Sequence, residues 1–140
     1  MKVFIEKKTI SNELAQQMIL AAKAKAEELQ VAVDIAVTDT GGHLIAFSRM
    51  DSAPLLSIDI AQNKAYTAVA FGLPTHEWYP LIEKQPALKA GIVHTPRLVV
   101  FGGGYPIFHN KKLAGGIGVS GGSEEQDRLC CEAALRLLTI

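Results

Sequence analysis

A run of glycines near the carboxyl end of the chain most narrows the folds that this sequence can adopt. The segment Gly102–Asp127, GGGYPIFHNKKLAGGIGVSGGSEEQD, holds eight of the twelve glycines. Glycine costs conformational entropy in regular structure and is favoured where backbone takes a positive φ or approaches another group closely. The pattern predicts a hairpin, with Ile107–His109 ending one strand, Asn110 and Lys111 in the turn, and 113–120 as a second strand with one face free of side chains. We expect a large element to pack on that bare face.

Three of these glycines, Gly116, Gly118 and Gly121, spell GxGxxG between the predicted strand and a following helix. A dinucleotide-binding loop needs this motif inside a βαβ unit, with an acidic residue about twenty positions further on. Only one helix is expected between the motif and Ile140, with no second strand. We therefore interpret the glycines as a connection that lets the strand enter the helix.

The helix after this connection has clear start signals. Ser123 is a good N-cap, and Gln126 three positions later completes a capping box. Glu124, Glu125 and Asp127 place negative charge in the first turn, where the helix dipole favours it. These acids also argue against a phosphate bound at the helix start, because an anion there would meet like charge.

Length and charge exclude several classes of protein. The 140 residues fit one domain, so we treat 1–140 as a single unit. Its 14 basic and 14 acidic residues give no attraction to nucleic acid or an anionic membrane. No run is long enough for a membrane span, and Met1–Ile10 lacks the apolar core of a signal peptide. Cys130 and Cys131 are adjacent, a poor geometry for a mutual disulfide, so we expect a reducing, cytoplasmic location.

The other elements follow from apolar periodicity and from chain breakers. The order predicts an α/β (α+β) sandwich built on an antiparallel sheet of about five strands. We expect residues 3–5 as an edge strand or a leading arm, a helix to about Gln30 with Ser11 as its N-cap, and a hairpin over 31–49. A helix from the 51–54 region to about Phe71 should follow, with Gly72 as its C-terminal stop, and then an irregular stretch over 73–96 and a buried strand at Arg97–Phe101.

The second of these helices carries a stripe of alanines, which implies close approach to another backbone. Lys64 lies at the border of that stripe. It either snorkels to solvent or presents its charge to a ligand acid or a neighbouring subunit. Asp59 one turn before Asn63 either pairs along the helix or caps an adjacent loop.

Three blocks of the sequence resemble the signature blocks of the GlcG/HbpS family. They are RMDSAPLLSIDIAQNKAYTA at Arg49–Ala68, GGGYPI at Gly102–Ile107 and LAGGIGVSGGSEEQD at Leu113–Asp127. The resemblance runs from about Ser11 to Leu138 and keeps the block order. Similar sequences occur as the C-terminal domain of PduO-type cobalamin adenosyltransferases and as small proteins of glycolate, diol or glycerol utilisation operons. The triplet of Thr75, His76 and Glu77 is most similar to the PduO-like branch.

This resemblance implies a profilin-like fold, in which a five-stranded antiparallel sheet lies between helices, and assembly into homo-oligomers. It also implies haem or corrinoid-related binding, because several relatives bind haem and some are described as promoting its breakdown. The implied function is a cytoplasmic, oligomeric haem- or tetrapyrrole-binding protein linked to cobalamin-dependent diol or glycerol metabolism. The alternative is a non-catalytic accessory or assembly protein of that pathway with no bound cofactor.

A tetrapyrrole site needs an apolar slot, one or two axial donors and cations for the propionates. His76 is the main candidate for the metal ligand, because it lies in the most aromatic-rich segment and within the PduO-like triplet. Trp78 beside it is a candidate cofactor contact. Lys64 and Arg49 are candidate partners of the propionates, and an ordinary salt bridge is the alternative for each. The remaining histidines are weaker candidates: His43, His94 and His109.

Nothing in the sequence predicts catalysis by the protein alone. It has no Ser-His-Asp spacing, no HExxH motif and no P-loop, so any chemistry would come from a cofactor. A third hypothesis is a small-molecule enzyme that uses Lys64, Asp59 and Arg49 in a cleft between subunits. Three other carboxylates are interpreted as turn or cap residues: Asp39, Asp51 and Glu77.

Overall fold

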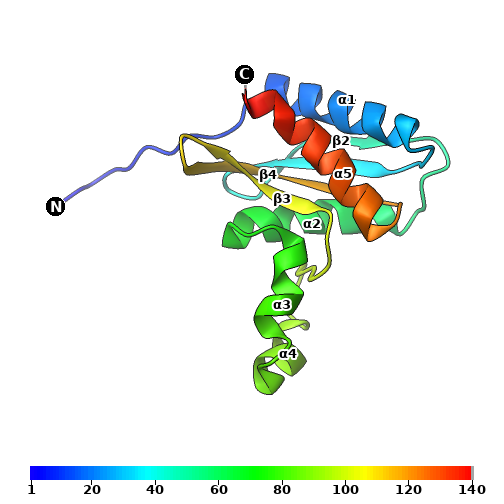
Figure 1. The fold of residues 1–140 in the computed structure, drawn as a ribbon. Coiled ribbons are helices and arrows are strands. Elements are labelled where there is room, and N and C mark those ends of the chain that lie inside the picture. Colours follow the sequence, from blue (N-terminus) through cyan, green and yellow to red (C-terminus); the bar gives the residue numbers. More distant parts are fainter. Residues whose placement is uncertain (140) are drawn as a thin grey trace.

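The computed structural model describes residues 1–139 and consists of one antiparallel sheet between two layers of helices (Figure 1). Helices α1 (Asn12–Glu28) and α5 (Glu124–Leu135) cover one face of the sheet, and α2 (Ser57–Phe71) covers the other. The strands lie in the order β2-β1-β4-β3. Their bounds are Asp34–Asp39 for β1, Leu44–Arg49 for β2, Gly104–His109 for β3 and Lys112–Ser120 for β4.

Three short helices follow α2 in the stretch that the sequence marked as irregular. They are η1 (Thr75–Glu77), α3 (Trp78–Ile82) and α4 (Pro86–Ile92), and α3 and α4 project away from the sheet (Figure 1). A last short helix, η2 (Arg136–Thr139), continues from α5. No helix within residues 1–139 combines the length and the hydropathy needed to cross a membrane.

The predicted capping signals are confirmed. The Ser11 side chain accepts a hydrogen bond from the backbone of Leu14, and Ser123 and Gln126 form both bonds of a capping box. Helix α2 ends at Gly72, whose φ of 70° lies in the left-handed region that glycine adopts without strain. The local sequence therefore sets where these three helices begin or end.

The main core lies between the sheet and the α1–α5 layer. Strand positions that alternate along β1 and β4 point into it, and small side chains of both helices let the layers approach closely. The fully buried members include Ile35 and Val37 of β1, Ile117 and Val119 of β4, Met18, Ala22 and Ala26 of α1, and Cys130, Cys131 and Ala134 of α5.

The opposite face carries the glycines and accepts the backbone of α2. A Cβ added at Gly118 would collide with the carbonyl oxygen of Ala61, and one added at Gly116 would collide with that of Ala65. Ala61 and Ala65 themselves pack on Ala36 of β1. The prediction that a large element covers a bare face is confirmed, and the element is α2.

The prediction of about five strands is wrong, because the sheet has four. Arg97–Phe101 is not a strand; it packs on α2 through Thr67, whose hydroxyl donates to the Arg97 carbonyl at 2.9 Å and accepts from the Val99 amide at 3.0 Å. The backbone groups that a strand would offer to a neighbour are thus partly taken by a side chain. Only Val99 of this segment is buried.

Residues 1–9 form an exposed, extended arm, with no strand assigned to them. The next residue, Ile10, anchors the arm by donating its amide to the carbonyl of Ala114 at 2.8 Å. Of the two alternatives for residues 3–5, the leading arm is therefore the one observed.

We expect Gly118→Ala to lower the free energy of unfolding by about 1–3 kcal/mol, because the added methyl group must push α2 off the sheet. Gly91→Ala is the matched control: it lies in α4, and a Cβ built there meets nothing within 4 Å. Urea unfolding followed by circular dichroism measures both. Equal stability of the two variants would contradict the close packing of α2.

Candidate functional site

The four residues proposed from the sequence do not converge on one site. Lys64 lies in the middle of α2 and Arg49 ends β2, whereas His76 and Trp78 lie in η1 and at the start of α3. The structure therefore divides them among a buried ion pair, a polar row across the sheet, a cluster at the outer edge of β3 and an apolar cavity beside α2.

Lys64 is buried and its charge is used inside the chain. Only 1% of the residue is exposed, and its ammonium group donates to the carboxylate of Asp127 at 3.0 Å and to the carbonyl of Val119 at 2.9 Å. The other carboxylate oxygen of Asp127 accepts from the amide of Gly122. Burial raises the pKa of Asp127, and the neighbouring ammonium counteracts this rise. The pair ties α2 to the start of α5.

The loop before β3 closes over this pair. Gly103 has a φ of 118°, and a Cβ at this position would lie 2.6 Å from the Lys64 nitrogen. The ring of Phe101 lies 5.1 Å from the same nitrogen. The ordinary salt bridge weighed for Lys64 is thus the arrangement observed, and it leaves the ammonium no exposed face.

Arg49 belongs to a row of polar residues across three strands. Asp34 of β1 pairs with Arg49 of β2 on one side and with Ser120 of β4 on the other. Arg49 is exposed, and its guanidinium donates to the carbonyl of Ala53 at 2.9 Å. The hydroxyl of Ser120 donates to that of Ser57, the first residue of α2, at 3.1 Å.

Asp34 is the residue of this row whose side chain lacks hydrogen-bond partners in the described part of the protein. It is completely buried, and neither carboxylate oxygen has a hydrogen-bond partner within residues 1–139. Burial raises the pKa of Asp34, and the positive charge of Arg49 counteracts this only in part. A buried acid without partners avoids the large cost of a buried charge by keeping its proton. We therefore assign Asp34 a structural place rather than a ligand-binding one.

His76 lies at the outer edge of the sheet, against β3 and near α5. Its ring is 5.5 Å from the ring of Tyr105 between centroids, and its Nδ1 atom is buried without a hydrogen-bond partner in the described chain. Burial lowers the pKa of His76, and the cation of Arg128 lowers it further, against the opposing effect of nearby glutamates. The imidazole is therefore kept neutral at pH 7 and can act as a donor to a metal.

A polar cluster that the sequence did not reveal lies beside His76. The hydroxyl of Tyr105 donates to the carboxylate of Glu132 at 2.9 Å and accepts from Arg128 at 3.4 Å. Burial, the largest cause, raises the pKa of Tyr105 to about 12, so the phenol keeps its proton. Arg128 and Glu132 are four positions apart on α5, a spacing that puts both on one face of the helix.

Trp78 faces a different surface from His76. Its ring packs on Phe71 with centroids 4.9 Å apart, and its indole nitrogen is buried without a partner among residues 1–139. It lines an apolar cavity of about 250 Å³ between the end of α2 and the segment after α4. The cavity is also lined by Tyr66, Thr67, Ala70, Phe71, Ile92, Thr95, Pro96 and Leu98.

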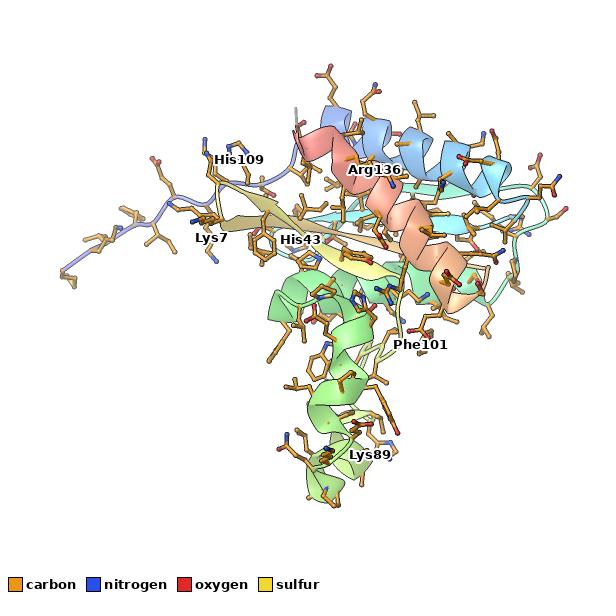
Figure 2. The ribbon with its side chains drawn as sticks, viewed as in Figure 1. Lys7, His43, Lys89, Phe101, His109 and Arg136 are labelled. Carbon is orange, nitrogen blue, oxygen red and sulfur yellow. The ribbon has the colours of Figure 1, made fainter. Side chains whose placement is uncertain are left out.

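These observations fit a haem group at the edge of β3 better than elsewhere. His76 supplies a neutral imidazole and Arg128 supplies a cation near it. The side chain of Phe101, on the loop before β3 (Figure 2), is exposed. The cavity at Trp78 is smaller than the roughly 300 to 1,000 Å³ that encloses a drug-sized ligand. His76 and Arg128 therefore lie on one surface, and the apolar cavity at Trp78 lies on another.

The other histidines and the cysteines have local roles. His43 bonds Asp39 across the β1–β2 turn, with ring-to-carboxylate distances of 3.2 Å, and His94 and His109 are exposed. Both cysteines are free and buried, and burial raises the pKa of Cys130 to about 11. Within residues 1–139 no three His, Cys, Asp or Glu side chains gather as a metal site would require.

These observations define a mixed α/β domain that has an antiparallel sheet between helices and a neutral histidine at the sheet edge. The chain belongs to the family described as "Haem degrading protein HbpS-like", whose model matches residues 10–136. The family predicted from the three sequence blocks is thus confirmed.

Relatives and solved structures extend this result. The chain is 43% identical over 128 residues to an uncharacterised 15.0 kDa protein in the dhaT-dhaS intergenic region of Citrobacter freundii, covering 91% of this chain and 90% of that protein. It is 38% identical to the corrinoid adenosyltransferase PduO of Citrobacter freundii, over 94% of this chain but only 40% of PduO. The crystal structure of a PduOC–haem complex is 35% identical, with a TM-score of 0.82, covering 91% of this chain and 94% of that one.

We expect Lys64→Met to lower the free energy of unfolding by about 3–5 kcal/mol, because Asp127 would keep a buried charge without its partner. The double variant Lys64→Met/Asp127→Leu should recover part of this loss. Lys23→Met is the control, since Lys23 and Glu27 form an exposed pair at 4.0 Å and its loss should cost less than about 0.5 kcal/mol. Denaturant unfolding measures all three, and a Lys64→Met protein as stable as the control would contradict the buried pair.

The pH dependence of stability tests Asp34. The folded pKa is above the unfolded value of 3.8, so its contribution to stability is full below that value and is lost as the pH rises through the folded pKa. Asp34→Asn should therefore be more stable than the wild type at pH 7, and the gain should shrink toward pH 4. Asp51→Asn, at an exposed turn position, is the control. Stability of Asp34→Asn that falls relative to wild type between pH 4 and pH 7 would show that folding lowers the pKa of Asp34 instead of raising it.

Proposed function

We propose that this protein is a haem- or tetrapyrrole-binding protein that acts as a homo-oligomer, with His76 as the axial donor. The observation that carries the proposal is the neutral, half-buried imidazole of His76 at the sheet edge, with the cation of Arg128 near it. The family description and the solved PduOC–haem complex support haem as the group bound.

One residue near His76 suits a part of such a ligand, and two others support the histidine ring. The guanidinium of Arg128 suits a propionate, a role that Lys64 cannot fill from inside its ion pair. Tyr105 stands against the imidazole and is itself held by Glu132, so the histidine ring has a fixed neighbour. Haem supplies redox and oxygen chemistry when bound, whereas the chain supplies the donor, the cation and the shape of the surface.

The proposal extends to assembly, location and pathway. Leu55 and Leu56 before α2 are 79% and 74% exposed, and large apolar side chains in such positions favour burial against another copy. Two free cysteines suit a reducing cytoplasm. The similarity to PduO and to the dhaT-dhaS region protein supports a link to corrinoid-dependent diol or glycerol metabolism.

A second candidate function is that of an accessory protein that binds another protein of such a pathway and holds no cofactor. The α3–α4 projection favours it, because Tyr79, Leu81 and Val93 on or next to these helices are between 46% and 48% exposed. Co-purification of a corrinoid-dependent dehydratase from cell lysate, with no spectral response to hemin, would select this candidate.

Titration of the apo-protein with hemin tests the first proposal. We expect a saturable shift of the Soret band, and His76→Ala should weaken binding by about tenfold or more, since even residues that only orient a metal ligand cost that much when removed. His94→Ala is the control, because His94 is exposed and lies in the segment that follows α4. An unchanged Soret band at tens of micromolar hemin would overturn haem binding.

The pH range of hemin binding tests the assignment of His76. Ligation needs the neutral ring, and the pKa of His76 is lowered from 6.5. Binding through His76 should therefore persist as the pH falls below 6.5 and be lost only at the lowered pKa. If His76→Ala binds hemin as tightly as the wild type does, haem binding stands but His76 is not the axial donor.

A further inference from the structure

The arm of residues 1–9 exposes a group of apolar side chains that nothing within residues 1–139 covers. Val3, Phe4 and Ile5 are 69%, 87% and 65% exposed. The arm runs outward past the β3–β4 hairpin, and Figure 2 shows Lys7 on the same side of the molecule as His109 at the hairpin end. Three consecutive exposed apolar residues in an extended segment favour a partner surface.

The base of the arm is fixed to the sheet. The amide of Ile10 donates to the carbonyl of Ala114, and the amide of Thr40 donates to the hydroxyl of Thr9 at 2.9 Å. Beyond this base the arm has an unpaired, extended backbone, which can accept another strand. The base thus fixes the direction of the arm, while the backbone N–H and C=O groups beyond the base remain available for pairing.

The charge order of the arm is complementary to itself. In the sequence Lys2-Val3-Phe4-Ile5-Glu6, antiparallel pairing of two copies centred on Phe4 sets Lys2 opposite Glu6 of the second copy and Val3 opposite its Ile5. A shift of one position toward the body puts Lys2 opposite Lys7, and a shift the other way puts Lys2 opposite Ile5. Only the register centred on Phe4 matches charge with opposite charge and apolar with apolar.

We propose that the arms of two copies pair as antiparallel strands centred on Phe4 and related by a two-fold axis. In such a contact the same surface is used on both copies, so each favourable pair occurs twice. This inference rests on the proposed self-association and specifies the segment that directs it. The partner is a second copy of this chain.

Additional apolar surface lies where the paired strands would meet the body. A two-stranded ribbon is marginal alone in water, so it needs packing against other elements. A cavity of about 250 Å³ opens at the arm base, beside Lys8, and Met1 of the second copy, opposite Lys7, would lie next to this base. Its apolar lining includes Ile10, Leu14, Ile107, Phe108 and Leu138.

A charge exchange tests the register. Lys2→Glu places like charges at both ends of the ribbon and should weaken self-association by about five- to thirtyfold, a change of 1–2 kcal/mol. The double variant Lys2→Glu/Glu6→Lys restores opposite charges and should return to within about threefold of wild type. Lys84→Glu makes the same charge change at an exposed position outside the arm and is the control. Sedimentation velocity at about 0.15 M salt measures the four proteins.

Cysteine cross-linking tests the centre of the ribbon. Phe4→Cys should form a disulfide-linked dimer under mild oxidation, because paired strands bring these Cα atoms to about 5 Å, within disulfide range. Lys8→Cys should not, since two such positions lie about 26 Å apart along the ribbon. The native cysteines are buried with raised pKa values and do not compete.

The outcomes separate this inference from the proposed self-association. A monomeric wild-type protein would overturn both. An assembled protein in which Lys2→Glu has no effect, or in which Lys8→Cys cross-links as readily as Phe4→Cys, would overturn arm pairing alone. Hemin binding is measured separately and decides neither.

Discussion

The contact between the backbone of α2 and the glycine face of β4 is the constraint on which the rest of this structure depends. Because Gly116 and Gly118 have no side chains, the carbonyl groups of Ala61 and Ala65 approach the strand directly. This close approach brings Lys64, between those alanines, within reach of the Val119 carbonyl and the Asp127 carboxylate. One ion pair thus connects the helix on one face of the sheet to a helix on the other. The net contribution of such a pair to stability is small, since two buried charges must first lose their water.

Sequence reasoning was accurate where a local rule or a short-range pattern decides the structure. The bare strand face, the capping box at Ser123 and the end of α2 at Gly72 each follow from residues within a few positions. The prediction of a fifth strand was wrong because an apolar run such as Arg97–Phe101 indicates an extended, partly buried segment, but does not indicate which group the segment pairs with. Its partner is the hydroxyl of Thr67, a side chain about thirty positions earlier.

The candidate site was less predictable, because its contacts join residues far apart in the chain. Lys64 and Asp127 are separated by 63 positions, and the sequence presents Asp127 as one of three acids in a helix start. Asp34 stands in an apolar run where nothing signals an unpartnered carboxylate. His76 was found through the aromatic residues and the triplet around it, yet its neighbour Tyr105 and the cation Arg128 come from β3 and α5. The i, i+4 spacing of Arg128 and Glu132 was the one signal of this polar cluster in the sequence.

Haem binding at His76 and pairing of the arms are compatible, because they use opposite ends of β3. Tyr105, beside His76, is the second residue of this strand, and His109, beside the arm, is its last. At about 3.3 Å per residue the two ends are separated by about 13 Å, so strands paired beyond the hairpin would leave the edge near His76 uncovered. Lys64 reinforces this division, because its charge is paired with Asp127 inside the protein rather than facing a ligand. A tetrapyrrole at that edge would meet the cation of Arg128, while assembly through the arms would proceed at the far end of the same strand.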